Sequence, residues 1–264
     1  MSRNFELLKR AEQDRQIRPI AGVETLDSAR PLRPLPSEER RSVPASPMDA
    51  THPGIVDSAA PEISKLVQNL FVLPAIAAPR VVVFSPMVRS AKPDFISAQV
   101  AEALIDQRLG TVLVADCDVH RPSLHAYFDI PFAPGFTDVL KSQEPVQLFA
   151  HGVAGTALTV LTAGMATRDW QHLLAGDVMT ERLRAFRSHF DFVVINTPPV
   201  SECPSVVTLG QRSDGVVLVI EANDTKRDVA VRVKQQWERA NTRLLGAVLN
   251  NRTFPIPDRL YARL

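Results

Sequence analysis

Two carboxylates and an arginine lie close together where an apolar segment ends near the middle of the chain. The run Val112–Asp116 has the composition of a buried strand, and Asp118 and Arg121 follow it. Carboxylates at a strand end can hold a hydrated Mg²⁺ or orient a water molecule, and an arginine can pair with phosphate oxygens or with a carboxylate. Asp116, Asp118 and Arg121 are therefore the candidate catalytic residues. The alternative is that Asp116 and Arg121 only cap and tie down the following turn.

The elements that would position these residues alternate along the chain. Continuous runs rich in Val, Leu and Ile are typical of strands that are covered by helices on both faces of a parallel sheet. We expect strands at Val81–Ser85, Val112–Asp116, Leu158–Ala163, Phe192–Asn196, Val216–Glu221 and Leu245–Asn250. We expect helices near residues 94–108, 170–189, 200–211 and 225–240. This rhythm predicts an α/β fold, a three-layer doubly wound and mainly parallel sheet, in which ligands bind beyond the carboxyl ends of the strands.

The composition limits the classes of function. The chain has 264 residues, 45% of them hydrophobic, and a formal net charge of +1, which argues against a general nucleic-acid binder. Two cysteines, Cys117 and Cys203, are too few for a disulfide framework and are expected to be small core residues of a protein in a reducing compartment. No apolar stretch reaches the length of a signal peptide core or a membrane span. We expect a cytoplasmic protein that reaches the inner membrane through a partner.

The N-terminal part of the chain differs in composition from the rest. Residues 1–18 are expected to contain a short amphipathic helix, with Phe5, Leu8 and Ala11 on one stripe. Residues 19–60 are rich in proline and poor in apolar residues, which predicts a flexible, disordered linker. Residues 61–264 are expected to form the α/β domain.

Several motifs in order resemble one family of bacterial proteins. The segments DCDVHRPSLH at 116–125, PGFTDVL at 134–140 and FDFVVINTPPV at 190–200 are similar to those of the polysaccharide-biosynthesis tyrosine kinases. The helical stretch from His172 to Leu183 and the last two expected strands also resemble that family. The resemblance covers about residues 61–252, and it implies a P-loop NTPase-like domain related to the MinD and ParA proteins. It further implies ATP and Mg²⁺ as cofactors, tyrosine phosphorylation in a C-terminal cluster, and cooperation with a membrane protein that controls polysaccharide chain length.

The segment after the first expected strand departs from the family pattern. The family pattern places a G-x-x-x-x-G-K-[ST] loop there, because bare backbone must curl around the phosphates. Here no glycine occurs between Gly54 and Gly110. In one register Pro93 and Asp94 replace the lysine and the hydroxyl residue, and Asp94 is also a good N-cap for the next helix. With a one-residue gap, Lys92 supplies the lysine, and Lys92 and Arg89 are the candidate phosphate-binding cations.

Other positions implied by the resemblance are also changed. Asn196 stands where an aspartate would hold Mg²⁺ through its water shell, so that Asp116 and Asn196 are the candidate metal ligands. Asn250, at the end of the last expected strand, is a further candidate cofactor-binding residue. Tyr261 is the candidate phosphoacceptor in place of a tyrosine cluster. Its alternative role is to pack with Phe254, Ile256 and Leu260 against the domain or a partner.

Three functional readings follow from these residues. The first is a degenerate family member, a pseudokinase or adaptor, which regulates capsule or exopolysaccharide production and export with a membrane-bound polysaccharide copolymerase. The two ends of the chain, residues 1–16 and 254–264, are then the expected docking elements, and a homo-oligomer stays open because the family's oligomerising helix is altered at Lys65 and Gln68. The second reading is an active ATP- and Mg²⁺-dependent tyrosine autokinase with an unorthodox phosphate loop. The third is a relative of the MinD and ParA positioning ATPases.

Overall fold

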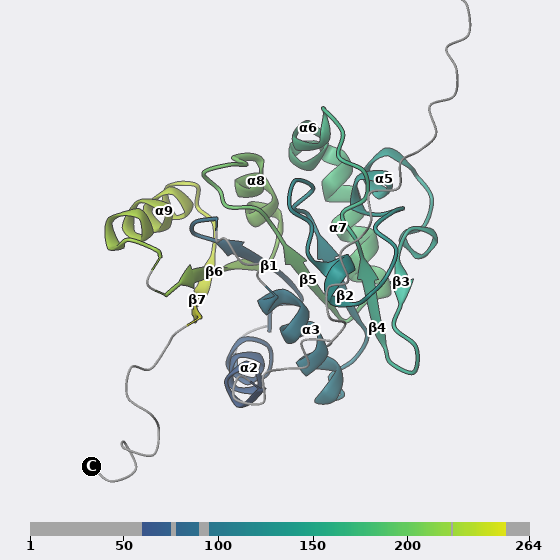
Figure 1. The fold of residues 1–264 in the computed structure, drawn as a ribbon, viewed down its shortest axis with the longest axis horizontal. Helices are drawn as coiled ribbons and strands as arrows, with labels where there is room; N and C mark the ends of the chain where they lie inside the picture. The colour runs from purple at the N-terminus through teal and green to yellow at the C-terminus, as the bar shows by residue number, and fades with distance from the viewer. Residues whose placement is uncertain (1–59, 75–77, 90–94, 223, 252–264) are drawn as a thin grey trace, which may run out of the picture. The chain divides into compact units, whose positions relative to one another are not determined.

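A seven-stranded sheet organises the described part of the chain (Figure 1). The computed structural model describes residues 60–74, 78–89, 95–222 and 224–251. The strands are β1 (Val81–Pro86), β2 (Val112–Asp116), β3 (His151–Gly152), β4 (Leu158–Leu161), β5 (Phe192–Asn196), β6 (Gly215–Glu221) and β7 (Leu244–Asn250). The helices are α2 (Ala60–Val67), α3 (Ile96–Asp106), α4 (Leu124–Tyr127), α5 (Phe136–Lys141), α6 (Trp170–Ala175), α7 (Asp177–His189), α8 (Ser205–Arg212) and α9 (Arg227–Arg239). A π-helical turn η1 (Gln68–Val72) extends α2, and η2 (Val146–Leu148) is a short 3₁₀ turn.

The sheet has the predicted parallel, doubly wound arrangement. Its strand order is β3-β4-β2-β5-β1-β6-β7, and every neighbouring pair is parallel except β3 with β4. The chain therefore passes from β1 to β2 across β5, and from β5 to β6 across β1. As a result, the carboxyl ends of β1, β2 and β5 lie beside one another at one edge of the sheet, where ligands bind in this class of fold.

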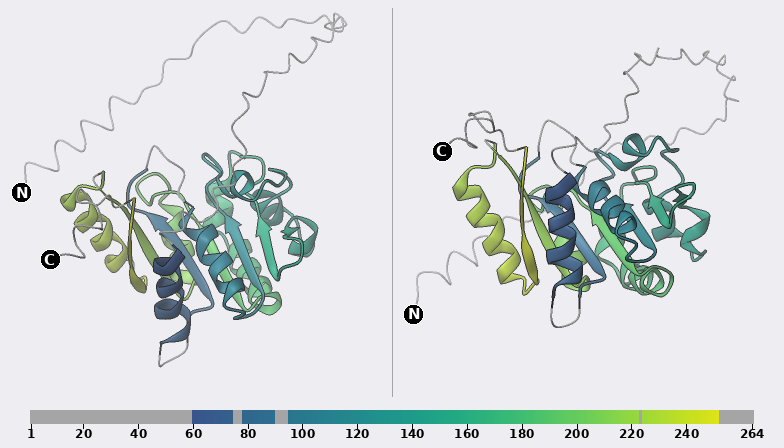
Figure 2. Two further views of the ribbon diagram at one scale, coloured as in Figure 1. Left: turned by 60° about the horizontal axis from the view of Figure 1, so that its bottom comes forward. Right: turned by 90° about the horizontal axis from the view of Figure 1, so that it is seen from below.

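Helices cover both faces of the sheet and separate two hydrophobic clusters. Along β1, Val81 and Val83 contribute to one cluster, and Val82 and Phe84 to the other, because successive side chains of a strand point to opposite faces. Helices α2 and α3 cover the second face and lie in front of the sheet in both views of Figure 2. Helices α5 to α9 supply the first cluster. This double burial explains why the strands are continuous apolar runs.

The sequence-based element boundaries differ from the structure at a few places. The helix expected over residues 170–189 is two helices, α6 and α7, which are separated by Gly176 in an extended conformation. The helix expected from residue 200 begins only at Ser205, after Pro204. The short elements α4, α5 and β3 were not predicted, because segments of a few residues carry too little periodicity to be recognised.

One carboxylate fixes the start of the central strand. Asp214 Oδ2 accepts the backbone N–H groups of Arg80 at 2.7 Å and Val81 at 2.8 Å, and the Arg187 guanidinium donates to both Asp214 oxygens at 3.0 and 2.8 Å. Burial opposes ionisation of Asp214, but the hydrogen bonds from Arg187 and the two amides lower its pKa on balance. This network connects β1, α7 and the residue before β6, and so holds the sheet edge opposite the candidate site.

Candidate functional site

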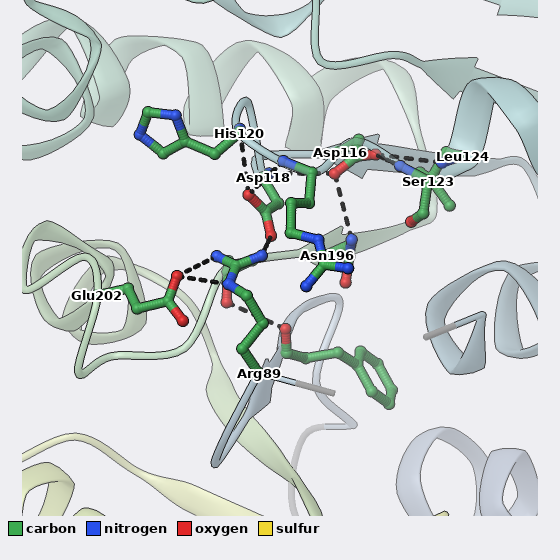
Figure 3. Close-up of polar contacts among 11 residues, drawn as sticks. Arg89, Asp116, Asp118, His120, Ser123, Leu124, Asn196 and Glu202 are labelled. Atoms are coloured by element: carbon green, nitrogen blue, oxygen red, sulfur yellow. Dashed lines mark hydrogen bonds and ion pairs between the residues drawn. The ribbon is translucent and has the colours of Figure 1, made fainter. Parts of the chain in front are cut away.

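Asp116 lies at the carboxyl end of β2 and is completely buried. Its Oδ2 accepts the backbone N–H groups of Ser123 at 2.8 Å and Leu124 at 3.1 Å, and its Oδ1 accepts the backbone N–H of Asp118 at 3.1 Å (Figure 3). The Asn196 side-chain amide donates to the same Oδ1 at 3.2 Å. Both carboxylate oxygens are therefore used to hold the loop between β2 and α4 in place.

Burial changes the proton affinity of this carboxyl group. Desolvation raises the pKa of Asp116 to about 6, although the hydrogen bonds from Ser123, Leu124, Asp118 and Asn196 act in the opposite direction. The group is ionised at neutral pH and becomes protonated in mildly acidic solution. All of these hydrogen-bond donors are neutral. The free-energy cost of burying the negative charge of Asp116 is therefore offset by hydrogen bonds and not by an ion pair.

Asn196 ends β5 and lies next to Asp116, because β5 pairs with β2. An aspartate at this position would place two anions side by side, and a cation would then be needed to hold them together. The neutral amide donates a hydrogen bond directly to Asp116 instead. This contact gives Asp116 Oδ1 a side-chain donor and lowers the pKa of Asp116 against the effect of burial.

Arg89 follows β1 and its guanidinium lies between two carboxylates (Figure 3). Its Nη1 donates to Asp118 Oδ2 at 2.9 Å, and its Nε donates to Glu202 Oε2 at 2.5 Å. A second nitrogen of the same group also pairs with Glu202. We name Arg89, Asp118 and Glu202 the ion triad. It joins the segments that follow β1, β2 and β5.

The charges of the ion triad stabilise one another. The hydrogen bond to Glu202 raises the pKa of Arg89, and the same bond lowers the pKa of Glu202. The Asp118 side chain is 9% exposed, the Arg89 side chain 21% and the Glu202 side chain 42%, so water screens the Glu202 contact far more than the Asp118 contact. Loss of the Arg89–Asp118 contact would therefore cost more folding stability than loss of the Arg89–Glu202 contact.

Among the other candidate residues, Arg121 contacts the ion triad and Asn250 lies away from it. The Arg121 backbone N–H donates to Asp118 Oδ1 at 3.1 Å, and the Arg121 charge helps to lower the pKa of Glu202. Asn250 lies at the end of β7, where its side chain donates to Glu221 at 3.4 Å, and β1 and β6 separate it from β5. Lys92, Asp94 and Tyr261 lie outside the described residues.

Sequence reasoning missed Glu202 and found only part of the role of Arg89. Glu202 follows β5 by a few residues, so its position after a strand end was the available signal. Sequence reasoning assigned Arg89 to phosphate, whereas the structure pairs it with carboxylates. Both cysteines are free and buried, as predicted. Within the described ranges, no group of three or more His, Cys, Asp or Glu side chains is arranged to hold a metal ion.

Tyr127, the tyrosine of the described domain, is not a surface phosphoacceptor. It is buried, its hydroxyl donates to Glu102 Oε2 at 2.7 Å, and desolvation and that bond raise its pKa. Its ring contacts Phe95 and Phe128 at centroid distances of 5.0 and 4.9 Å. Tyr127 is thus a core residue that anchors α4 against α3.

Several curated proteins that are similar in sequence are bacterial tyrosine kinases. Tyrosine-protein kinase YwqD of Bacillus subtilis is 29% identical over 141 residues, which are 53% of this chain and 60% of that protein. The putative tyrosine-protein kinase EpsB of Ralstonia solanacearum is 30% identical over 157 residues, 59% of this chain and 21% of that protein. Tyrosine-protein kinase etk of Escherichia coli K12 is 28% identical over 170 residues, 62% of this chain and 23% of that protein. No family model matches the chain.

Solved structures agree with these sequence matches. The kinase domain of VpsO superposes with a TM-score of 0.66 at 25% identity, over 74% of this chain and 95% of that domain. The chimerical protein CapA2B2 gives 0.68 at 23% identity, over 74% of this chain and 85% of that one. The MinD cell division protein of Aquifex aeolicus gives 0.53 at 17% identity, over 70% and 72%, and shares the fold. In sequence and in fold, the α/β domain is similar to bacterial tyrosine-protein kinases.

This similarity makes the segment after β1 the most informative part of the site. The family pattern places a glycine-rich phosphate loop directly after the first strand. In this chain β1 pairs with β6 as far as Pro86, and the Met87 N–H then donates to Val219 O at 2.9 Å. Arg89 follows and turns toward the carboxylates (Figure 3). The chain spans about 60% of YwqD and about one-fifth of EpsB and etk, so the functions of those whole proteins do not transfer to it directly.

Proposed function

We propose that this chain is a non-catalytic member of the family, an adaptor that regulates capsule or exopolysaccharide production together with a membrane-bound copolymerase. The observation that carries this proposal is the ion triad. An arginine of the chain itself supplies the positive charge between Asp118 and Glu202, at the sheet edge where the family would bind nucleotide and Mg²⁺.

The carboxylates do not fit a magnesium ion in this arrangement. Mg²⁺ requires near-ideal octahedral oxygen coordination and usually retains several waters. To reach Asp118, the ion would have to displace the Arg89 guanidinium, which lies 2.9 Å from Asp118 Oδ2. To reach Asp116, it would have to compete with the four hydrogen bonds that fix the following loop.

Phosphate binding meets a second obstacle. Without glycine, the positive-φ turns and the close backbone approach that a phosphate loop needs become costly. No glycine lies between Gly54 and Gly110, and the N–H of Met87 is already bonded to β6. Arg89 could attract phosphate oxygens only by leaving two carboxylates. ATP with Mg²⁺ therefore does not fit the described residues.

The direct test is nucleotide chemistry of the purified full-length chain. We expect phosphate release and autophosphorylation in ATP and Mg²⁺ to be indistinguishable from those of the Asp118→Asn variant. That variant keeps the buried Asp116 and the size of the side chain at position 118, and its folding is checked by urea unfolding. Turnover by the wild type that is lost in Asp118→Asn would support the alternative, an active autokinase that uses Lys92 or Arg89 as its phosphate-binding cation.

The adaptor role requires a partner, and the proposed docking element is the N-terminal segment, residues 1–16. Its stripe of Phe5, Leu8 and Ala11 could pack on a partner surface, because a helix of this length gains its stability from docking. No helix in the described ranges is long and apolar enough to cross a membrane. Membrane association would then come from the copolymerase.

Recovery of a polysaccharide copolymerase from membranes would test this docking role. We expect full-length protein to retain the copolymerase, and protein lacking residues 1–16 to lose it. A Phe5→Asp and Leu8→Asp double variant keeps the chain length and should behave like the deletion. Equal recovery by all three proteins would move the docking surface to the α/β domain.

A further inference from the structure

Strand β7 ends the sheet and is an unprotected edge. Its sequence, Leu244 to Asn250, contains neither a charged residue nor a proline, and such residues commonly protect edge strands from further pairing. A register irregularity lies only at its beginning, opposite Val216 and Val217. From Gly246 onward β7 is regular, and nothing in the described ranges pairs with its outer side.

The hydrogen-bond pattern shows which backbone groups face outward. The Ala222 N–H donates to Asn250 O at 2.9 Å, so that the polar groups of Asn250 face the β6 side. Because successive residues of a strand direct these groups to opposite sides, Leu249 and Ala247 direct theirs away from the sheet. Within the described part of the chain, two amides and two carbonyls of β7 thus face outward without a neighbouring strand.

The side chains of these two residues also lack cover. Ala247 pairs with Leu218 and Leu249 pairs with Ile220, so both point to the same sheet face as these residues, the face of the first hydrophobic cluster. Ala247 is exposed, and the Leu249 side chain is 51% exposed. A strand added beside β7 would bury this apolar surface as well as satisfy the backbone.

The chain that follows β7 has a sequence suited to that position. Asn251 has a positive φ of 52°, a conformation that reverses chain direction after a strand, and its side chain is held by Glu221. The next residues include Phe254-Pro255-Ile256-Pro257-Asp258. The prolines alternate with residues that have an N–H, so one side of this segment can donate hydrogen bonds while the other cannot.

We propose that residues 254–258 add to β7 as an antiparallel edge strand, with Phe254 opposite Leu249 and Ile256 opposite Ala247. In this register the N–H groups of Phe254 and Ile256 face the free backbone groups of β7. Their side chains lie on the same face as Leu249 and Ala247, because directly opposed residues share a face. A shift by one residue would place both prolines against β7 and lose these bonds.

This register also explains the two prolines. Pro255 and Pro257 would face outward, and a proline on the outer side of an edge strand prevents the pairing of another chain. A second copy of β7 could satisfy the same edge. The covalent link favours the chain's own segment, since a short connection gives an effective concentration in the millimolar range. The inference is independent of whether the domain binds nucleotide.

Amide hydrogen exchange of the full chain, compared with a chain that ends at Thr253, tests the proposal. We expect the Ala247 and Leu249 amides to exchange at least about tenfold faster in the shortened chain, because they lose their hydrogen bonds. The amides of Val114 and Val194, in the central strands, should be unchanged in both and so report that the domain remains folded. Equal exchange of Ala247 and Leu249 in the two proteins would overturn the proposal.

Two matched proline variants test the register. Ile256→Pro removes an N–H that faces β7 and should reproduce the fast exchange of the shortened chain. Pro257→Ala changes the outward side and should retain the protection. Protection that survives Ile256→Pro, or that depends on protein concentration, would exclude the segment and indicate pairing between two copies of β7.

Discussion

At the scale of single residues, one arginine changes what the site can do. Arg89 lies within hydrogen-bond distance of both Asp118 and Glu202, and the neutral Asn196 donates to Asp116. Arg89 supplies positive charge to two carboxylates, and Asn196 supplies a neutral donor to a third. Both therefore act on the carboxylates that follow β2 and β5.

Replacement of Arg89 by alanine should make the protein dependent on divalent cations. Asp118 and Glu202 would face each other without a positive charge, and we expect a loss of about 1–2 kcal/mol in the free energy of unfolding. Mg²⁺ should restore part of this loss in Arg89→Ala and leave the wild type unchanged, as measured by urea unfolding with and without Mg²⁺. Arg232→Ala is the matched control, since Arg232 forms an exposed ion pair with Asp228. A wild type stabilised by Mg²⁺ to the same extent would contradict this account.

Because the Asp116 carboxyl group is buried, we expect it to change the pH dependence of the free energy of unfolding. Its folded-state pKa of about 6 lies above the ordinary value of 3.8, so the folded protein binds the proton more tightly than the unfolded chain. The Asp116 contribution to stability is therefore greatest below pH ~4, falls as the pH rises to about 6 and is then constant, by an amount on the order of 3 kcal/mol. Asp116→Asn removes this dependence, so its destabilisation should be larger at low pH than at neutral pH in urea unfolding. A difference between the two proteins that does not change with pH would show that the pKa is not raised.

At the scale of elements, the sequence predicts what depends on long apolar runs and misses what depends on single contacts. The six expected strands and their parallel arrangement follow from runs such as Val112–Asp116 and Phe192–Asn196. The break at Gly176 depends on one extended residue within a helical pattern. Glu202 approaches Arg89 from a loop, where no periodicity reports on position. Such contacts depend on tertiary packing, and the local hydrophobic pattern of a sequence does not predict tertiary packing.

The packing of α8 against α9 predicts a steric effect at Gly210. A Cβ atom there would lie 2.5 Å from a ring carbon of the buried Trp237 and 3.0 Å from Val216 Cγ2. We expect Gly210→Ala to lower the free energy of unfolding by about 1–3 kcal/mol, because an overpacked core must shift. Gly246→Ala is the control, since a Cβ at Gly246 meets nothing within 4 Å. Equal stability of the two variants in urea would show that α8 and α9 are less tightly packed than described.

At the scale of the whole molecule, the fold and the candidate site depend on different interactions. The hydrophobic clusters on both sheet faces account for the fold, and neither cluster needs the residues of the ion triad. A fold and a site can therefore change independently. This separation is compatible with the proposed adaptor role, which requires a stable domain but no catalytic site.

The proposed division of the chain into residues 1–18, 19–60 and 61–264 gives the last prediction. Eight prolines occur from Pro19 to Pro61, with few apolar residues between them, whereas helix α2 begins at Ala60 and buries Ile63 and Val67. A segment that buries little apolar surface cannot repay its ordering entropy. Limited proteolysis should therefore cut first within residues 19–60 and leave a resistant fragment that begins near Ala60. A recombinant chain of residues 60–264 should unfold with the same midpoint as the full-length protein. If it unfolds at a clearly lower midpoint, or if the resistant fragment begins well before residue 60, the N-terminal residues contribute to the fold and the proposed boundary is wrong.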